Sequence, residues 1–179
     1  MRETIFINVL GAPGTGKTTI SAMIFAEMRR RGMDVAAVAE FAKQAIWEGR
    51  NKVLDNEILL FTVMHHGVHV VNGETEYAVV DGSMLQTTMY NEVDGKVEHL
   101  SELAETQFNT FNNINLFIKN DGEFETKDRV HDEDTARELQ RILMEQFNRY
   151  SSFEKVFDVH SFDAVEFVDR IESGDYKQI

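Results

Sequence analysis

Residues 11–18 form a glycine-rich segment whose residue types and spacing could hold phosphate groups. The segment is Gly-Ala-Pro-Gly-Thr-Gly-Lys-Thr and matches G-x-x-x-x-G-K-[ST] in full. Its glycines let the backbone curl so that successive N–H groups point at phosphate oxygens, and the helix beginning near Lys17 adds its positive dipole end. The Lys17 ammonium then reaches the β- and γ-phosphates, and the Thr18 hydroxyl binds Mg²⁺. We expect these residues to bind the phosphates of ATP or GTP: Gly11, Ala12, Pro13, Gly14, Thr15, Gly16, Lys17, Thr18 and Thr19.

Asp81 is a second residue with the chemistry to handle phosphate. It ends an apolar segment at residues 77–80 that is typical of a buried strand, and Gly82 and Ser83 follow it. A carboxylate at this point of a phosphate-loop protein holds Mg²⁺, often through water. The alternative is an ordinary aspartate that caps the next helix. A motor-type ATPase usually places a glutamate directly after this aspartate, so Gly82 disfavours that class. We expect Asp81 to be a metal ligand or base, and Ser83 to contact substrate.

Glu40 and its neighbours are candidates for binding the group that receives a phosphoryl group. Glu40 follows an apolar strand-like segment at residues 35–39. Its carboxylate could accept a hydroxyl proton or bind a sugar hydroxyl. Phe41 and Trp47 could stack on a flat base, with Lys43 as a further substrate contact. The alternatives are a helix cap for Glu40 and a core position for Trp47.

The polar segment at residues 119–132 follows another apolar segment, at residues 114–118, and could be a lid. A lid over phosphates needs a cation to neutralise charge on the moving phosphoryl group. Arg129 is the first candidate, followed by Lys127 and Arg137. Because the segment is also rich in Asp and Glu, a solvated acidic loop is the alternative.

The elements that must position these residues alternate between strands and helices. This pattern predicts an α/β fold with a parallel sheet covered on both faces, and ligands in such sheets bind at the carboxyl ends of the strands. The expected strands are residues 5–10, 35–39, 77–80, 114–118 and 155–159. The expected helices are residues 17–31, 42–47, 57–71, 98–112, 134–150 and 161–171, the last with Ser161 as its N-cap.

Length and composition restrict the class of protein further. The chain has 179 residues, which is typical of a single domain, and 42% of them are apolar, which is typical of a globular protein. It has no cysteine, no long apolar run and no evident signal peptide, so we expect a cytoplasmic protein. The net charge of -13 disfavours non-specific binding to duplex DNA.

The phosphate loop, residues 40–43, residues 79–83 and residues 115–129 together resemble small P-loop kinases related to ribosylnicotinamide kinase and thymidylate kinase. The chain is especially similar to compact ATPase/kinase proteins of phage genomes, one group of which phosphorylates 5-hydroxymethyluracil in DNA. The resemblance implies a three-layer P-loop NTPase fold with a five-stranded parallel sheet, ATP and Mg²⁺ as cofactors, and a lid that closes on the phosphates. Thymidylate kinases typically have arginine after the third-strand aspartate, so Gly82 here favours a hydroxyl acceptor over a phosphate acceptor.

The sequence therefore predicts one P-loop kinase domain over residues 1–179, with a lid at about residues 119–132. It would transfer the γ-phosphoryl group of ATP to a nucleoside-like hydroxyl, with Glu40 or Asp81 as base and Arg129 covering the developing charge. The net charge favours a free small acceptor, whereas the phage resemblance keeps a base in DNA open. The alternative is a regulatory ATPase switch. A GTPase is disfavoured because residues 119–122 do not match the Asn-Lys-x-Asp motif.

Overall fold

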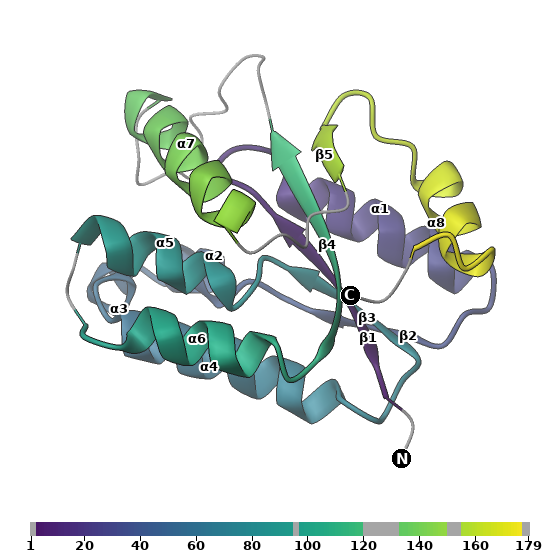
Figure 1. Cartoon of the computed structure of the whole chain (residues 1–179), viewed down its shortest axis with the longest axis horizontal. Coiled ribbons are helices and arrows are strands. Elements are labelled where there is room, and N and C mark those ends of the chain that lie inside the picture. The colour runs from purple at the N-terminus through teal and green to yellow at the C-terminus, as the bar shows by residue number, and fades with distance from the viewer. Residues whose placement is uncertain (1–2, 95–96, 120–132, 150–154, 177–179) are drawn as a thin grey trace.

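A computed structural model describes residues 3–94, 97–119, 133–149 and 155–176. Five parallel strands form one sheet in the order β2-β3-β1-β4-β5, so the predicted α/β fold with a five-stranded parallel sheet is confirmed (Figure 1). The phosphate-loop strand lies at the centre, as expected for a sheet in which chain segments cross over between neighbouring strands. The strands are β1 (Ile5–Leu10), β2 (Val35–Val38), β3 (Tyr77–Asp81), β4 (Asn112–Lys119) and β5 (Lys155–Asp158).

Helices cover both faces of the sheet. One face carries α1 and α8, and the other carries the remaining helices, with α4 and α6 side by side at its base (Figure 1). The bounds are α1 (Lys17–Arg30), α2 (Phe41–Trp47), α3 (Asn51–Leu54), α4 (Glu57–Val71), α5 (Leu85–Asp94), α6 (Leu100–Phe108), α7 (Glu133–Arg149) and α8 (Ala164–Glu172). In the described part of the chain, every helix is too short or too polar to cross a lipid bilayer.

The two faces have separate apolar cores because side chains alternate along each strand. In β1, Phe6 and Leu10 pack with α4, α5, α6 and α7, whereas Ile7 and Val9 pack with α1 and α8. All four side chains are fully buried, so β1 is fixed from both sides. The phosphate loop therefore begins from a strand that is buried on both faces of the sheet.

A group of buried asparagines fixes β1 against β4. The Asn8 side-chain amide donates hydrogen bonds to Asn113 Oδ1 at 2.9 Å and to Asn115 Oδ1 at 3.0 Å. Asn113 in turn donates to the backbone carbonyls of Phe108 and Phe111, both at 2.8 Å. Because buried amides are costly unless they are hydrogen-bonded, this network specifies one register between the two strands. That register places Leu10 opposite Phe117 at the start of the phosphate loop.

Several helix and strand bounds differ from the sequence-based expectations. The predicted helix at 98–112 spans only Leu100–Phe108, and β4 already begins at Asn112, because the buried asparagines extend a strand that apolar residues alone did not indicate. Helix α8 begins at Ala164 rather than near Ser161. Its N-cap is Asp163, whose carboxylate accepts hydrogen bonds from the backbone N–H groups of Val165 and Glu166. Helices α3 and α5 were not predicted.

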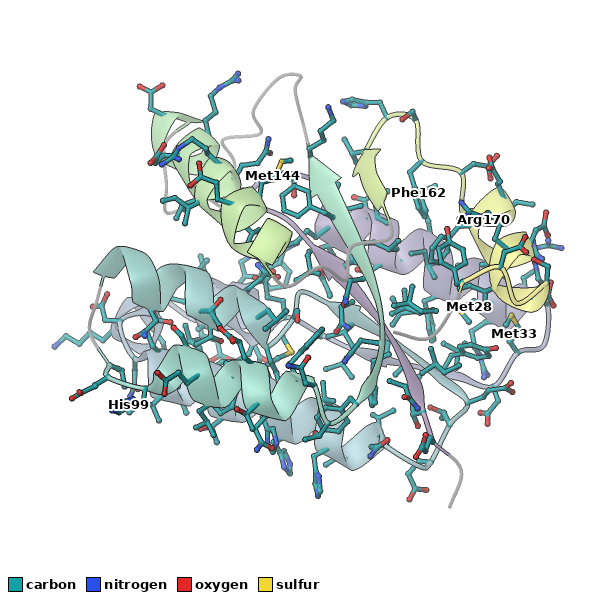
Figure 2. The ribbon with its side chains drawn as sticks, viewed as in Figure 1. Met28, Met33, His99, Met144, Phe162 and Arg170 are labelled. Atoms are coloured by element: carbon teal, nitrogen blue, oxygen red, sulfur yellow. The ribbon has the colours of Figure 1, made fainter. Side chains whose placement is uncertain are left out.

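Arg31 joins the end of α1 to α8. Its guanidinium donates to Glu27 at 2.7 Å, to Asp169 and Glu172 at 2.6 Å each, and to the Val165 carbonyl at 3.1 Å. Figure 2 shows Met28, Met33, Phe162 and Arg170 on this side of the molecule near α8, with His99 on the opposite side. The network therefore closes the edge of one apolar core with charge-assisted hydrogen bonds.

We expect Glu27 to make the stability of the protein depend on acid pH. The hydrogen bonds from Arg30 and Arg31 lower the pKa of Glu27 from 4.5 to about 2. Because the folded-state pKa lies below the unfolded value, this stabilisation is present above about pH 4.5 and is lost as the pH falls through about 2.

Glu27→Gln should therefore lower the melting temperature at pH 7, and the difference in melting temperature from the wild type should narrow between pH 5 and pH 2. Thermal unfolding followed by circular dichroism across this range measures both, with Glu74→Gln as an exposed control. A constant gap at all pH values would contradict the assignment.

Candidate functional site

The predicted phosphate loop connects β1 directly to α1. Gly14 and Gly16 have φ of 83° and 87°, in the left-handed region that favours glycine. A Cβ at Gly16 would lie 2.4 Å from a methyl group of Val159, and one at Gly11 would lie 2.4 Å from the backbone oxygen of Ile118. Side chains are therefore excluded from both ends of the loop, where the backbone must pass close to the ends of β4 and β5.

Lys17 lies within this loop rather than in solvent. Its side chain is buried, and its ammonium donates a hydrogen bond of 3.0 Å to the Ala12 carbonyl. The Thr15 hydroxyl donates to the same carbonyl at 2.9 Å, so both side chains hold the loop in its curled form. Thr18 and Thr19 are exposed in the first turn of α1, and no side chain caps the start of this helix. The arrangement can therefore place a cation and a helix N-terminus against one anion.

Asp81 lies at the end of β3, next to the start of the phosphate loop. Its Cα pairs with that of Val9 in β1, and the following Gly82 N–H donates to the Val9 carbonyl at 2.9 Å. Asp81 is buried, yet its Oδ1 atom accepts no hydrogen bond. The cap of the following turn is instead Ser83, whose hydroxyl accepts a hydrogen bond of 3.2 Å from the Leu85 N–H. A buried carboxylate oxygen that is not needed for folding is suited to an ionic ligand.

A pocket opens beside Asp81 and contains part of the predicted acceptor side. Glu40 occupies the N-cap position of α2, but its side chain makes no capping hydrogen bond. Its carboxylate is therefore not used to start the helix. The predicted substrate residues Phe41 and Ser83 also line this pocket. The lining residues are Glu40, Phe41, Ala42, Glu57, Leu60, Met64, Gly82, Ser83, Gln86 and Thr87.

Lys43 and Trp47 do not line the pocket, although both lie on α2. Trp47 is 66% exposed, so it is not a core residue. The Lys43 ammonium lies 5.4 Å from the centre of the Trp47 ring, a distance at which a cation is attracted to an aromatic face. The structure therefore separates these two residues from Glu40 and Phe41, and they remain predicted substrate contacts only.

The predicted lid residues Arg129 and Lys127 lie outside the described residues. Arg137 lies in the second turn of α7, where it is exposed. Their roles over the phosphates stay predictions.

Glu57 and Gln86 are pocket residues that the sequence did not indicate. Glu57 is only 3% exposed in the first turn of α4, and Gln86 is 7% exposed in the first turn of α5. An acidic residue after the N-cap Asn56 is ordinary helix chemistry, because it favours the positive end of the helix dipole. Nothing in the residue pattern marks either side chain as buried, so only the packing of α4 and α5 identifies them.

The fold is similar to that of two kinds of solved kinase structure. Thymidylate kinase from Ehrlichia chaffeensis matches with a TM-score of 0.63 and 13% identity, over 95% of this chain and 99% of that chain. Deoxyadenosine kinase from M. mycoides with products dCMP and dCDP bound matches with a TM-score of 0.61 and 15% identity, over 94% and 97%. The same enzyme with bound dATP gives 0.58 and 16%, over 94% and 99%. At these identities the similarity shows the P-loop kinase fold.

A search of curated proteins finds no match. A family model, by contrast, matches most of the chain. The family AAA_28, described as AAA domain, matches residues 6–161, which include the phosphate loop, Asp81, the pocket and all of the five strands except Ile5. The chain therefore belongs to the AAA_28 family of AAA domains.

Proposed function

We propose that the protein is an ATP-dependent kinase that transfers the γ-phosphoryl group to a hydroxyl of a nucleoside-like acceptor. The observation that carries this proposal is the pocket beside the phosphate loop, which Glu40 lines with a carboxylate that makes no capping bond. A nucleotide switch needs the loop alone, whereas a kinase needs a second site next to it for the acceptor. The similarity of fold to thymidylate and deoxyadenosine kinases supports the same activity class.

The residues of the loop suit ATP and Mg²⁺. Lys17 would bind the β- and γ-phosphates, and the N–H groups at the start of α1 would surround them. The exposed Thr18 hydroxyl and the buried Asp81 Oδ1 atom, which has no hydrogen-bond partner, are hard oxygen ligands of the kind Mg²⁺ prefers. Within the described residues no three acidic or histidine side chains form a metal cluster. The ion would neutralise charge on the transferred group.

Glu40 would act as the general base. It would accept the proton of the acceptor hydroxyl as that oxygen attacks the γ-phosphorus and the bond to the β-phosphate oxygen breaks, with ADP as the leaving group. Asp81 is the second candidate for the base, and its contact with the metal would compete with this role. Arg129 is proposed as the lid residue that covers the developing charge.

The charges in the pocket favour a hydroxyl acceptor over a phosphate acceptor. Glu40 and Glu57 both line it, and none of its described lining residues is lysine or arginine. A nucleoside monophosphate would bring a further negative charge next to two carboxylates, and such like charges repel strongly when water is excluded. A free nucleoside is favoured by the net charge of -13. A base such as 5-hydroxymethyluracil in phage DNA is the second acceptor to be tested, and either reaction would place the protein in a cytoplasm.

Transfer of labelled γ-phosphate from ATP in the presence of Mg²⁺ tests the proposal. One acceptor pool holds nucleosides, nicotinamide riboside and nucleoside monophosphates, and the other holds DNA with and without 5-hydroxymethyluracil. We expect label in one pool, and we expect Glu40→Gln to lower kcat roughly 100-fold with little change in the KM for ATP. Glu48→Gln, an exposed residue at the C-cap of the same helix, is the matched control. Release of free phosphate that no acceptor stimulates would contradict the kinase and favour an ATPase switch.

A further inference from the structure

The Gln86 side chain connects the pocket to the phosphate loop. It lines the pocket, and its Nε2 atom donates a long hydrogen bond of 3.4 Å to the carbonyl oxygen of Gly11, the first residue of the loop. A backbone carbonyl can only accept a hydrogen bond, so the amide nitrogen must face it. This contact orients the amide nitrogen toward Gly11.

The amide oxygen of Gln86 is buried without a hydrogen-bond partner. Gln86 as a whole is 7% exposed. Leaving a buried acceptor unsatisfied is costly, and in native proteins such atoms commonly bind a ligand or an ordered water. Because Gln86 lines the pocket, a hydrogen-bond donor on a molecule that enters there would satisfy this oxygen.

Gly82 allows the amide to reach this position. Its φ is 101°, and a Cβ there would lie 2.9 Å from Gln86 Oε1 and 3.6 Å from the terminal methyl of Met64. A side chain at position 82 would therefore displace the Gln86 amide from the end of β3.

The carboxylates that line the pocket also favour a molecule that donates hydrogen bonds. Glu40 and Glu57 line it with carboxylates, which accept hydrogen bonds when ionised. The lining described here contains no lysine, arginine or histidine. A complementary acceptor molecule carries N–H or O–H donors on the side that faces Gln86, and no negative charge.

We propose that Gln86 is a specificity-determining residue of the acceptor site. Its Oε1 atom accepts a hydrogen bond from an N–H or O–H group of the acceptor molecule, while its Nε2 atom holds the side chain against Gly11. The site thereby selects acceptors that carry this donor over analogues that lack it, because the analogue leaves the buried oxygen unpaired. This role of Gln86 rests on the kinase function proposed above.

Matched pairs of acceptors measure this selection. Each pair holds a nucleoside and its N-methylated analogue, namely thymidine and N3-methylthymidine, deoxycytidine and its N4,N4-dimethyl analogue, and deoxyadenosine and its N6,N6-dimethyl analogue. Each nucleoside is also paired with its 3′-deoxy form, and the methylated pairs are offered in single-stranded oligonucleotides as well. The quantity compared is the ratio of kcat/KM within each pair, for the wild type and for Gln86→Met, which keeps the length of the side chain but removes the amide.

For at least one pair, we expect the wild type to prefer the donor-bearing member by roughly 10-fold, which is the size expected of one buried hydrogen bond. In Gln86→Met this preference should fall to within twofold, with the KM for ATP little changed. Gln86→Glu keeps an oxygen at this position and should retain a preference. Gln107→Met, a glutamine that contacts His65 at 3.2 Å and does not line the pocket, should leave the ratio unchanged. A ratio that stays the same in Gln86→Met, or an effect on ATP alone, would overturn the proposal.

Calorimetric binding of the same nucleosides to protein loaded with a non-hydrolysable ATP analogue separates this inference from the kinase proposal. Donor-selective binding that Gln86→Met weakens, without any label transfer, would support Gln86 and overturn the kinase. Transfer with unchanged selectivity in Gln86→Met would support the kinase and overturn the role of Gln86. Neither binding nor transfer in either acceptor pool would overturn both.

Discussion

Lys17→Ala should lower kcat/KM for phosphoryl transfer from ATP by roughly 1,000-fold or more. The Lys17 side chain is buried in the phosphate loop, where its charge is shielded from water and acts strongly on the phosphates. Its ammonium is held 3.0 Å from the Ala12 carbonyl, so it already lies within the loop that would bind the phosphates. The measurements are steady-state transfer of labelled γ-phosphate and the affinity for ATP by calorimetry, and both should fall.

The control for this variant lies on the same helix. Arg29→Ala removes an exposed cation from the last turn of α1, far along the helix from the loop, and should leave both quantities within about twofold of the wild type. Lys17→Met, which keeps the apolar stem, should behave as Lys17→Ala does, because the charge and not the packing is the functional part. Turnover that is unchanged in Lys17→Ala would remove the basis of the proposed kinase.

Asp81→Asn should lower kcat by about 100- to 1,000-fold and raise the Mg²⁺ concentration needed for half-maximal activity. The substitution keeps the size of the side chain but removes the charge that would attract the ion. Stability should respond in the opposite direction. Because Oδ1 is buried without a hydrogen bond in the protein alone, removing the charge should leave the melting temperature unchanged or raise it.

These opposite signs distinguish a metal site from a structural aspartate. Activity titrated with Mg²⁺ gives the first quantity, and thermal unfolding without nucleotide gives the second. Asp175→Asn, an exposed residue near the end of the described chain, should change neither. A loss of activity that is matched by a large fall in melting temperature would instead show that Asp81 supports the fold.

The fold was largely predictable because its signals are local. Apolar runs bounded by polar residues predicted all five strands, and Glu57–Val71 was predicted with both of its bounds. The errors occurred where tertiary contacts override local pattern. Asn112 and Asn113 extend β4 although asparagine disfavours strands, because Asn113 is satisfied by Asn8 and by two backbone carbonyls. Helix α5 was missed because most of its described buried residues are polar, namely Gln86, Thr87, Thr88 and Asn91.

The sequence by itself determined the phosphate loop, because residues 11–18 bind through backbone geometry that glycine spacing dictates. It also placed Asp81 at a strand end, since an apolar run that ends in a polar residue can be recognised in the sequence alone. Only the tertiary structure decided which acceptor-side residues share a pocket. It placed Glu40 and Phe41 there with Glu57 and Gln86, and it left Trp47 exposed outside the pocket. The physical reason is that burial and unpaired hydrogen-bonding atoms depend on how separate helices pack against one strand end, which no local pattern specifies.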